Sequence, residues 1–247
     1  MIANLINELK SAEDKKQAVN LQRFFKTGKG EYGEGDVFLG IKLPVQRQIA
    51  KKYTGLSLPK IQTLLNSKIH EHRLVGLLIL MDKYKKSDEK ERLGQARSGS
   101  SGERTKGDIF NFYLKNTKNV NNWDLVDLTA HKIVGDFLID KKRNKLYELA
   151  ESKDLWEKRI SIIACFAYLK DEDFKDALRI AEILLNDKHD LIHKAVGWVL
   201  REIGKKNQEV LEIFLKKHYK NMPRTMLRYS IERFGENKRQ DYLKGRI

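Results

Sequence analysis

The chain has 247 residues, and its 49 Lys and Arg against 34 Asp and Glu give a formal net charge of +15. Such an excess of cations favours a polyanionic partner, either nucleic acid or an anionic membrane surface. It counts against a protein-binding adaptor, whose groove would be apolar or acidic. The length suits one domain or one elongated array of repeats, and we expect a single domain over residues 1–247.

Several further classes of protein are excluded by the sequence. No window approaches the roughly 18 uninterrupted apolar residues that a membrane-spanning helix needs, and the first ten residues do not follow the pattern of a secretory signal. The single cysteine, Cys165, excludes an intrachain disulfide and a cysteine-based zinc site. We therefore expect an intracellular, cytoplasmic protein, associated with the nucleoid if the source is prokaryotic.

Apolar residues recur every three or four positions along most of the chain, which is typical of amphipathic helices. In chain order these runs are Leu5 and Leu9, Leu64 and Leu65, Leu74 to Met81, Ile160 to Leu169, Ala177 to Leu185, and Val210 to Leu215. With only three prolines and no sustained apolar–polar alternation, strands have little support. The sequence predicts an all-α fold.

Two segments interrupt this pattern. Gly28 to Gly35 is glycine-rich but lacks the preceding strand and the Lys-Ser/Thr ending of a phosphate-binding loop, so we interpret it as a connection between helices. Residues 87–107 contain the run Ser98 to Gly102, Ser-Gly-Ser-Ser-Gly, which is typical of flexible linkers. This segment is either a natural loop or an engineered insertion.

The helical segments also repeat. Arg159 aligns with Lys194 and Gly204 with Gly235, and Arg73 precedes a similar apolar run. Repeats of about 30 to 47 residues made of paired helices indicate a HEAT-like α-α superhelix, or solenoid. If the recurrent cation lines the inner helices, the concave face is basic and holds the phosphates of a duplex. The alternative is that these cations lie on ordinary solvated helix faces.

The segment Asn121 to Asp127 places an indole and a carboxylate four residues apart, at Trp123 and Asp127. On a helix these two side chains share one face. A simpler interpretation is that Asp127 lies near a helix start capped by Asn121 or Asn122, where the helix dipole favours a carboxylate. Both interpretations are open on spacing alone.

With these residues in view, the chain resembles the AlkD-like DNA alkylation repair proteins, which are DNA glycosylases built from HEAT-like repeats. Phe38 to Arg47 looks like the early helix junction of that family, and Asn122 to Asp127 looks like its Trp-Asp-x-x-Asp motif. Trp156 to Arg159 and Lys194 to Arg201 are similar to its later repeats. The resemblance covers most of the chain.

The resemblance implies an enzyme that hydrolyses the N-glycosidic bond of cationic N3- or N7-alkylated purines in double-stranded DNA. It implies no metal, no cofactor and no base-flipping pocket. An open DNA-binding groove works in a monomer, so we expect no obligate protein partner. Some relatives have the fold without the activity, so the alternative is a non-catalytic protein that binds damaged or branched DNA.

By the same resemblance, the catalytic carboxylate is Asp127 and the aromatic pair is Trp123 and Trp198. The family's essential arginine falls on Arg159, which we expect to clamp a phosphate with its two parallel donors. The remaining expected DNA contacts are Phe24, Lys42, Arg47, Lys194 and Arg201. By the resemblance, the best-known member of the family has a tyrosine in the first repeat where this chain has Phe24, so a hydroxyl is lost there. We expect Trp156 in the core and Asp124 in a capping or salt-bridging role.

Overall fold

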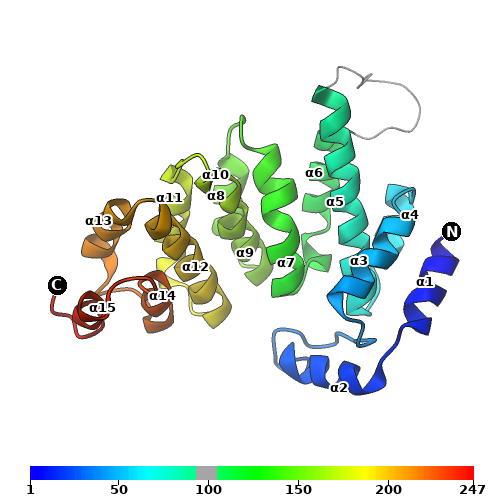
Figure 1. Ribbon diagram of the computed structural model, residues 1–247, viewed down its shortest axis with the longest axis horizontal. Coiled ribbons are helices and arrows are strands. Elements are labelled where there is room, and N and C mark those ends of the chain that lie inside the picture. Colours follow the sequence, from blue (N-terminus) through cyan, green and yellow to red (C-terminus); the bar gives the residue numbers. More distant parts are fainter. Residues whose placement is uncertain (93–104) are drawn as a thin grey trace. The chain divides into compact units, whose positions relative to one another are not determined.

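The computed structural model describes residues 1–92 and 105–247, and within them the chain is helical (Figure 1). Its only extended pairing in these residues is an isolated parallel bridge between Val37 and Ile69. None of the described helices is both long and apolar enough to cross a membrane. The all-α fold that the sequence predicts is confirmed.

The described chain divides into two compact units, residues 1–125 and residues 126–247. The helices of the first unit are α1 (Ile2–Ser11), α2 (Lys15–Phe24), α3 (Leu43–Lys52), α4 (Leu58–Leu65), α5 (His70–Arg92), α6 (Lys106–Lys115) and the short η1 (Thr117–Asn119). Helix α7 (Trp123–Ala130) includes the division between the units. In the first unit α5 packs against α1, α3, α4 and α6.

The second unit continues from α7 into a π-helical turn. Its elements are η2 (His131–Gly135), α8 (Asn144–Ala150), α9 (Leu155–Ala164), α10 (Phe166–Leu169), α11 (Lys175–Ile183), η3 (Leu184–Asn186), α12 (Asp190–Lys206), α13 (Gln208–His218), α14 (Arg224–Ser230) and α15 (Glu236–Leu243). Helix α9 packs against α8 and α12, and α12 packs against α11, α13 and α14. Within this unit the helix pairs follow one another in chain order, as in HEAT-like repeats (Figure 1).

Polar side chains mark where several of these helices begin. Thr105 and Asp108 form a reciprocal capping box at α6, with 3.1 Å between each backbone nitrogen and the partner's side-chain oxygen. Asp154 accepts hydrogen bonds from two backbone nitrogens at the start of α9, and Asn207 accepts one at the start of α13. The caps satisfy donors that the first helical turn leaves unpaired.

The core consists of apolar helix faces. Helix α5 buries Leu74, Val75, Leu77, Ile79 and Leu80, and α12 buries Ile192, Ala195, Val196, Val199, Leu200 and Ile203. Burying a side chain of this size stabilises the fold by about 1.5–3 kcal/mol before the entropic cost of ordering it. Most of the free energy that holds the helices together therefore comes from these faces.

The recurrent cation of the repeats does not occupy one common surface. Arg73 and Arg159 are both buried, and each forms an ion pair with a carboxylate, Asp36 and Asp127 respectively. Lys194 is more exposed and pairs with Asp190 on its own helix. Two of the three cations thus fix the interior of a unit, so they do not add charge to a groove.

The structure describes the first of the two segments that interrupt the helical pattern completely and the second only in part. Gly28 to Gly35 lies in the connection between α2 and α3, as expected. At the two ends of the expected loop at 87–107 the chain is helical, because α5 continues to Arg92 and Thr105 caps α6. The Gly/Ser run at 98–102 lies outside the described residues.

Gly135 allows η2 to approach α9 and α10 closely. A Cβ at this position would lie 2.2 Å from the carbonyl oxygen of Ala164 and 2.8 Å from the Cβ of Ala167. Both distances are well inside van der Waals contact, so any side chain would push the two segments apart. The close approach holds the helical segment that carries Asp127 against the helix that carries Arg159.

We expect Gly135→Ala to lower the free energy of unfolding by about 1–3 kcal/mol, the usual cost of overpacking a core. Gly55→Ala is the matched control, because a Cβ there meets nothing within 4 Å. Chemical denaturation of both variants measures the difference. Equal stability of the two variants would contradict the close packing described for Gly135.

Candidate active site

Helix α7 starts at a cluster of polar side chains. The Asn122 side-chain oxygen, which is fully buried, accepts a hydrogen bond from the Trp123 nitrogen at 2.8 Å. The Asp124 Oδ1 accepts one from the Leu125 nitrogen at 2.9 Å. Asn122 thus pairs with the first backbone nitrogen of the helix, whereas an N-cap side chain accepts from the second or third, so capping by Asn121 or Asn122 stays a prediction.

In the second unit Asp127 forms a bidentate ion pair with Arg159 of α9. Arg159 Nε donates to Asp127 Oδ1 and Nη2 donates to Oδ2, both at 2.8 Å. The third guanidinium nitrogen, Nη1, donates to the Leu191 carbonyl oxygen at 2.5 Å. The guanidinium is thus held in one plane by partners from α7 and α12.

Burial differs between the two members of this pair. Arg159 is only 4% exposed, whereas the Asp127 side chain keeps 16% of its surface accessible. A parallel pair of charge-assisted hydrogen bonds fixes the carboxylate plane as well as its position. Asp127 therefore presents an oriented carboxylate that solvent still reaches.

The role expected of Arg159 needs revision in this light. We expected its two parallel donors to clamp a phosphate, but Asp127 occupies both. Binding a phosphate with the same edge would require the ion pair to open. The geometry instead suits Arg159 to orienting the carboxylate.

The segment before α12 holds the Leu191 carbonyl in place. His189 Nδ1 accepts a hydrogen bond from the Leu191 nitrogen at 3.1 Å, and Lys158 Nζ lies 2.7 Å from Asp187 Oδ2. Burial opposes ionisation of Asp187, but its hydrogen bond from Lys158 lowers its pKa below the ordinary value. Sequence analysis missed Leu191, because a backbone carbonyl leaves no signature in residue type.

Trp198 and Trp156 occupy different environments in the second unit. Trp198 on α12 is half-buried, and its ring lies 4.6 Å from that of Phe166, measured between centroids. Trp156 on α9 is buried, as expected for a core residue. Of these two indoles, Trp198 is the one with accessible surface.

In the first unit Trp123 ends a stack of aromatic rings. Its indole lies 5.1 Å from the Phe25 ring at an interplanar angle of 19°, and Phe25 lies 5.0 Å from Phe38 at 16°. Phe38 in turn lies 4.5 Å from the His70 imidazole at 21°. Phe24 meets Trp123 edge-on at 5.9 Å. Phe25 thus supports the half-buried indole, and it packs in turn against both Phe38 and His70, whose ring lies 5.2 Å from that of Phe25.

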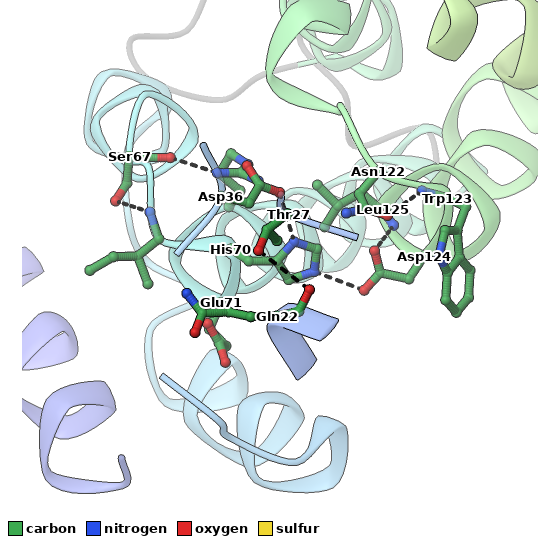
Figure 2. A network of polar contacts seen from close by, with 12 residues as sticks. Gln22, Thr27, Asp36, Ser67, His70, Glu71, Asn122, Trp123, Asp124 and Leu125 are labelled. Carbon is green, nitrogen blue, oxygen red and sulfur yellow. Dashed lines mark hydrogen bonds and ion pairs between the residues drawn. The ribbon is translucent and has the colours of Figure 1, made fainter. Parts of the chain in front are cut away.

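A buried cluster of charges surrounds the imidazole end of this stack. Figure 2 shows His70 between two carboxylates: Nε2 lies 2.8 Å from Asp124 Oδ2, and Nδ1 lies 3.6 Å from Asp36 Oδ2. Arg73 Nη2 donates to the same Asp36 oxygen at 2.6 Å. The expected salt-bridging role of Asp124 is confirmed.

Protonation of His70 follows from this setting. Burial opposes the charged imidazolium, but the Asp124 carboxylate, and then Asp36, outweigh it and raise the pKa of His70 to about 9. Burial likewise opposes ionisation of Asp36, yet its partners His70 and Arg73 lower its pKa. At neutral pH the cluster therefore contains two cations and two anions.

Glu71, next to His70 on α5, holds the loop that carries Phe38. Its carboxylate is fully buried and accepts hydrogen bonds from the backbone nitrogens of Leu39, Gly40 and Ile41, at 3.0, 2.8 and 3.2 Å. Gly40 has φ +85°, and a Cβ there would lie 2.1 Å from the Asp14 carbonyl oxygen, so only glycine fits. Sequence analysis missed the role of Glu71. The signal for it was a run of four polar residues at the start of an apolar helix, His70 to Arg73.

The expected DNA contacts fall into two groups. Phe24 is 63% exposed, and Lys42 and Arg47 at the start of α3 are exposed as well. Lys194 lies 2.7 Å from Asp190, and Arg201 pairs with Glu232 and with Glu202. The cations of the second group are already paired with carboxylates, whereas those of the first group are exposed.

Chemistry other than that of Asp127 has little support among the residues that the structure describes. No group of three His, Cys, Asp or Glu side chains within them is placed to hold a metal ion. Cys165 is fully buried, and burial raises the pKa of its thiol, which disfavours the reactive thiolate.

Comparisons with known proteins bear on the fold and on the family. In solved structures the fold is similar to that of a predicted DNA alkylation repair enzyme from Enterococcus faecalis, at 15% identity and a TM-score of 0.68, over 91% of this chain and 97% of that one. It is also similar to smu.31 from Streptococcus mutans UA159, at 18% identity and a TM-score of 0.51, over 87% of this chain and 95% of that one. A comparison with curated proteins finds no match.

At these identities the solved structures establish the fold alone. The family follows from the sequence itself, because residues 5–234 match the family model described as DNA alkylation repair enzyme. That match covers nearly the whole chain. The chain belongs to the DNA alkylation repair enzyme family.

Proposed function

We propose that this protein is a DNA glycosylase that hydrolyses the N-glycosidic bond of cationic N3- or N7-alkylated purines in duplex DNA. The observation that carries the proposal is the Asp127 carboxylate, which Arg159 holds in a fixed plane while 16% of the side chain stays accessible. Membership of the alkylation repair family supports the class of substrate.

The chemistry explains why an oriented carboxylate is useful. A purine alkylated at N3 or N7 is already positively charged, so it leaves without being protonated by an enzyme acid. The barrier lies in the positive charge that develops on the deoxyribose as the bond breaks. A fixed carboxylate stabilises this charge without reorganising, and it also orients or deprotonates the attacking water.

The other site residues have supporting roles in this proposal. The indoles of Trp123 in the first unit and Trp198 in the second are each candidates for packing against deoxyribose, because an electron-rich ring face favours the positively charged C–H groups. Arg159 orients Asp127 and stays in the protein interior. Phosphate contacts then come from exposed cations such as Lys42 and Arg47, whose side chains are accessible.

One observation favours a second candidate, a non-catalytic protein that binds damaged or branched DNA. Both oxygens of Asp127 already accept hydrogen bonds from Arg159, and a purely structural ion pair would look the same. In that case the pair holds α7 against α9, and DNA binding survives without base release. Loss of the carboxylate distinguishes the two candidates.

The first prediction concerns Asp127→Asn. We expect the single-turnover rate of 7-methylguanine release from a duplex to fall about tenfold or more. A tenfold fall corresponds to ~1.4 kcal/mol of lost transition-state stabilisation. DNA affinity, measured by fluorescence anisotropy, should stay unchanged. Asp140→Asn is the matched control, because it removes the same charge from an exposed site of the same unit.

The outcome of that experiment decides between the candidates. Base release by the parent and by Asp140→Asn, with a much slower rate for Asp127→Asn, supports the glycosylase. Absence of release by the parent above the uncatalysed background, with DNA binding intact, would establish the non-catalytic candidate instead.

A double-mutant cycle tests the revised role of Arg159. We expect Arg159→Gln and Asp127→Asn each to slow base release, and the double variant to be no slower than the worse single variant, because both act through one carboxylate. Thermal unfolding under assay conditions shows which variants are folded. Additive losses of rate in the double variant, together with weaker DNA binding, would instead support Arg159 as a residue that clamps a phosphate.

The proposed mechanism also predicts which lesions are excised. A neutral base is a poor leaving group, and no residue of the proposed site protonates it. We therefore expect release of 7-methylguanine but no measurable release of uracil from otherwise identical duplexes under single-turnover conditions. Efficient removal of uracil would overturn this mechanism.

A further inference from the structure

His70 has no part in the chemistry proposed above, yet it is one of the most completely buried charged groups in the described structure. Its side chain is 2% exposed, although the imidazolium has to be desolvated to reach this position. The ordinary way to fill such a site is an apolar side chain. A buried cation here needs a reason beyond filling space.

Two separate routes connect His70 to Trp123. Through polar contacts, Nε2 lies 2.8 Å from Asp124 Oδ2, and Asp124 directly follows Trp123 in the first turn of α7. Through ring contacts, the imidazole stacks on Phe38, Phe38 stacks on Phe25, and Phe25 stacks on the Trp123 indole. Figure 2 shows the polar route, with His70 and Trp123 on either side of Asp124.

We propose that His70 is a positioning residue for Trp123, and that its ring, bonded to Asp124 and stacked on Phe38, fixes the orientation of the indole. The claim that the orientation of the indole matters for catalysis rests on the proposed function. The claim that His70 positions the indole within the first unit is independent of that function. A ring that has to lie flat against a substrate sugar is sensitive to small rotations, because displacements of about 1 Å cost up to roughly a hundredfold in rate.

The charged groups that face His70 come from each element around it. Asp124 lies on α7, Asp36 lies in the loop before α3, and Arg73 lies on α5 with His70 itself. The nearest ring from the end of α2 is Phe25, which is uncharged. When His70 loses its proton, Nε2–H can still donate to Asp124, but the Nδ1 lone pair then faces the Asp36 carboxylate 3.6 Å away.

This geometry makes the position of Trp123 dependent on pH. The pKa of His70 is raised from an ordinary 6.5 to about 9, so the folded state binds this proton more tightly than the unfolded state. The resulting stabilisation is fully present below pH 6.5 and is lost as the pH rises through about 9. Above that pH, repulsion between Nδ1 and Asp36 should rotate the ring and disturb the stack.

The test uses the full chain labelled with 5-fluorotryptophan and observed by ¹⁹F NMR. The chain has three tryptophans, so three resonances are expected, and Trp→Phe variants assign them. The Trp123 resonance of the parent should titrate with a midpoint near 9, and His70→Gln should abolish this titration. The Trp156 resonance, from a buried ring in the second unit, should not follow it.

His72→Gln is the matched control. His72 is also buried near the start of α5, but its Nδ1 lies 3.0 Å from Ser67 Oγ and it takes no part in the stack. This variant should keep the Trp123 titration. In single-turnover base release at neutral pH, His70→Gln should be slower by about tenfold or more while DNA affinity changes less than about twofold, because the lost orientation acts on the transition state.

The outcomes separate this inference from the proposed function. A Trp123 resonance that ignores pH in the parent, or that titrates equally in His70→Gln, overturns the positioning role. A resonance that responds as expected in a parent that releases no base leaves His70 as the positioning residue and overturns the glycosylase. Should His70→Gln fail to fold, His70→Gln/Asp124→Asn replaces the ion pair by two neutral amides and must lose the titration too.

Discussion

The bidentate pair of Asp127 and Arg159 is the interaction on which the candidate site depends. Burying an arginine costs several kcal/mol in desolvation, and only a well-aligned partner with further hydrogen bonds offsets that cost. Arg159 has such partners, because Asp127 takes two of its nitrogens and the Leu191 carbonyl takes the third. The carboxylate is therefore held by the same contacts that make the buried guanidinium tolerable. Removing either partner leaves the other as an uncompensated charge.

Buried charges are also paired in the first unit. His70 and Arg73 are balanced by Asp124 and Asp36, and the fully buried Glu71 accepts hydrogen bonds from three backbone nitrogens. A low local dielectric makes each of these contacts strong, and it also makes a missing partner costly. Polar residues at the head of α5 thus hold the Phe38 loop and the first turn of α7 by direct hydrogen bonds and ion pairs.

Net charge and local charge have different consequences in this protein. The +15 balance makes attraction to a polyanion expected at long range. At short range, however, several arginines are committed to the interior: Arg143, for example, contacts Asp173 and Asp176 and lies over the Tyr168 ring. Counting cations therefore overestimates the number available to phosphates. The exposed ones, such as Lys42 and Arg47, are the better candidates for DNA contacts.

The sequence alone determined the helical class, the repeat of paired helices and the family, and it predicted Asp127 as the central carboxylate. Each of these depends on local spacing or residue type, which a linear pattern records: three-to-four periodicity, a recurring cation, a Trp-Asp-x-x-Asp motif. Tertiary structure alone decided the partners. That Arg159 bonds Asp127, that Leu191 offers its carbonyl and that His70 is a buried cation all depend on contacts between residues about 30 or more apart. Burial sets whether a cation meets solvent or a carboxylate, and a sequence pattern does not encode burial for a single charged residue.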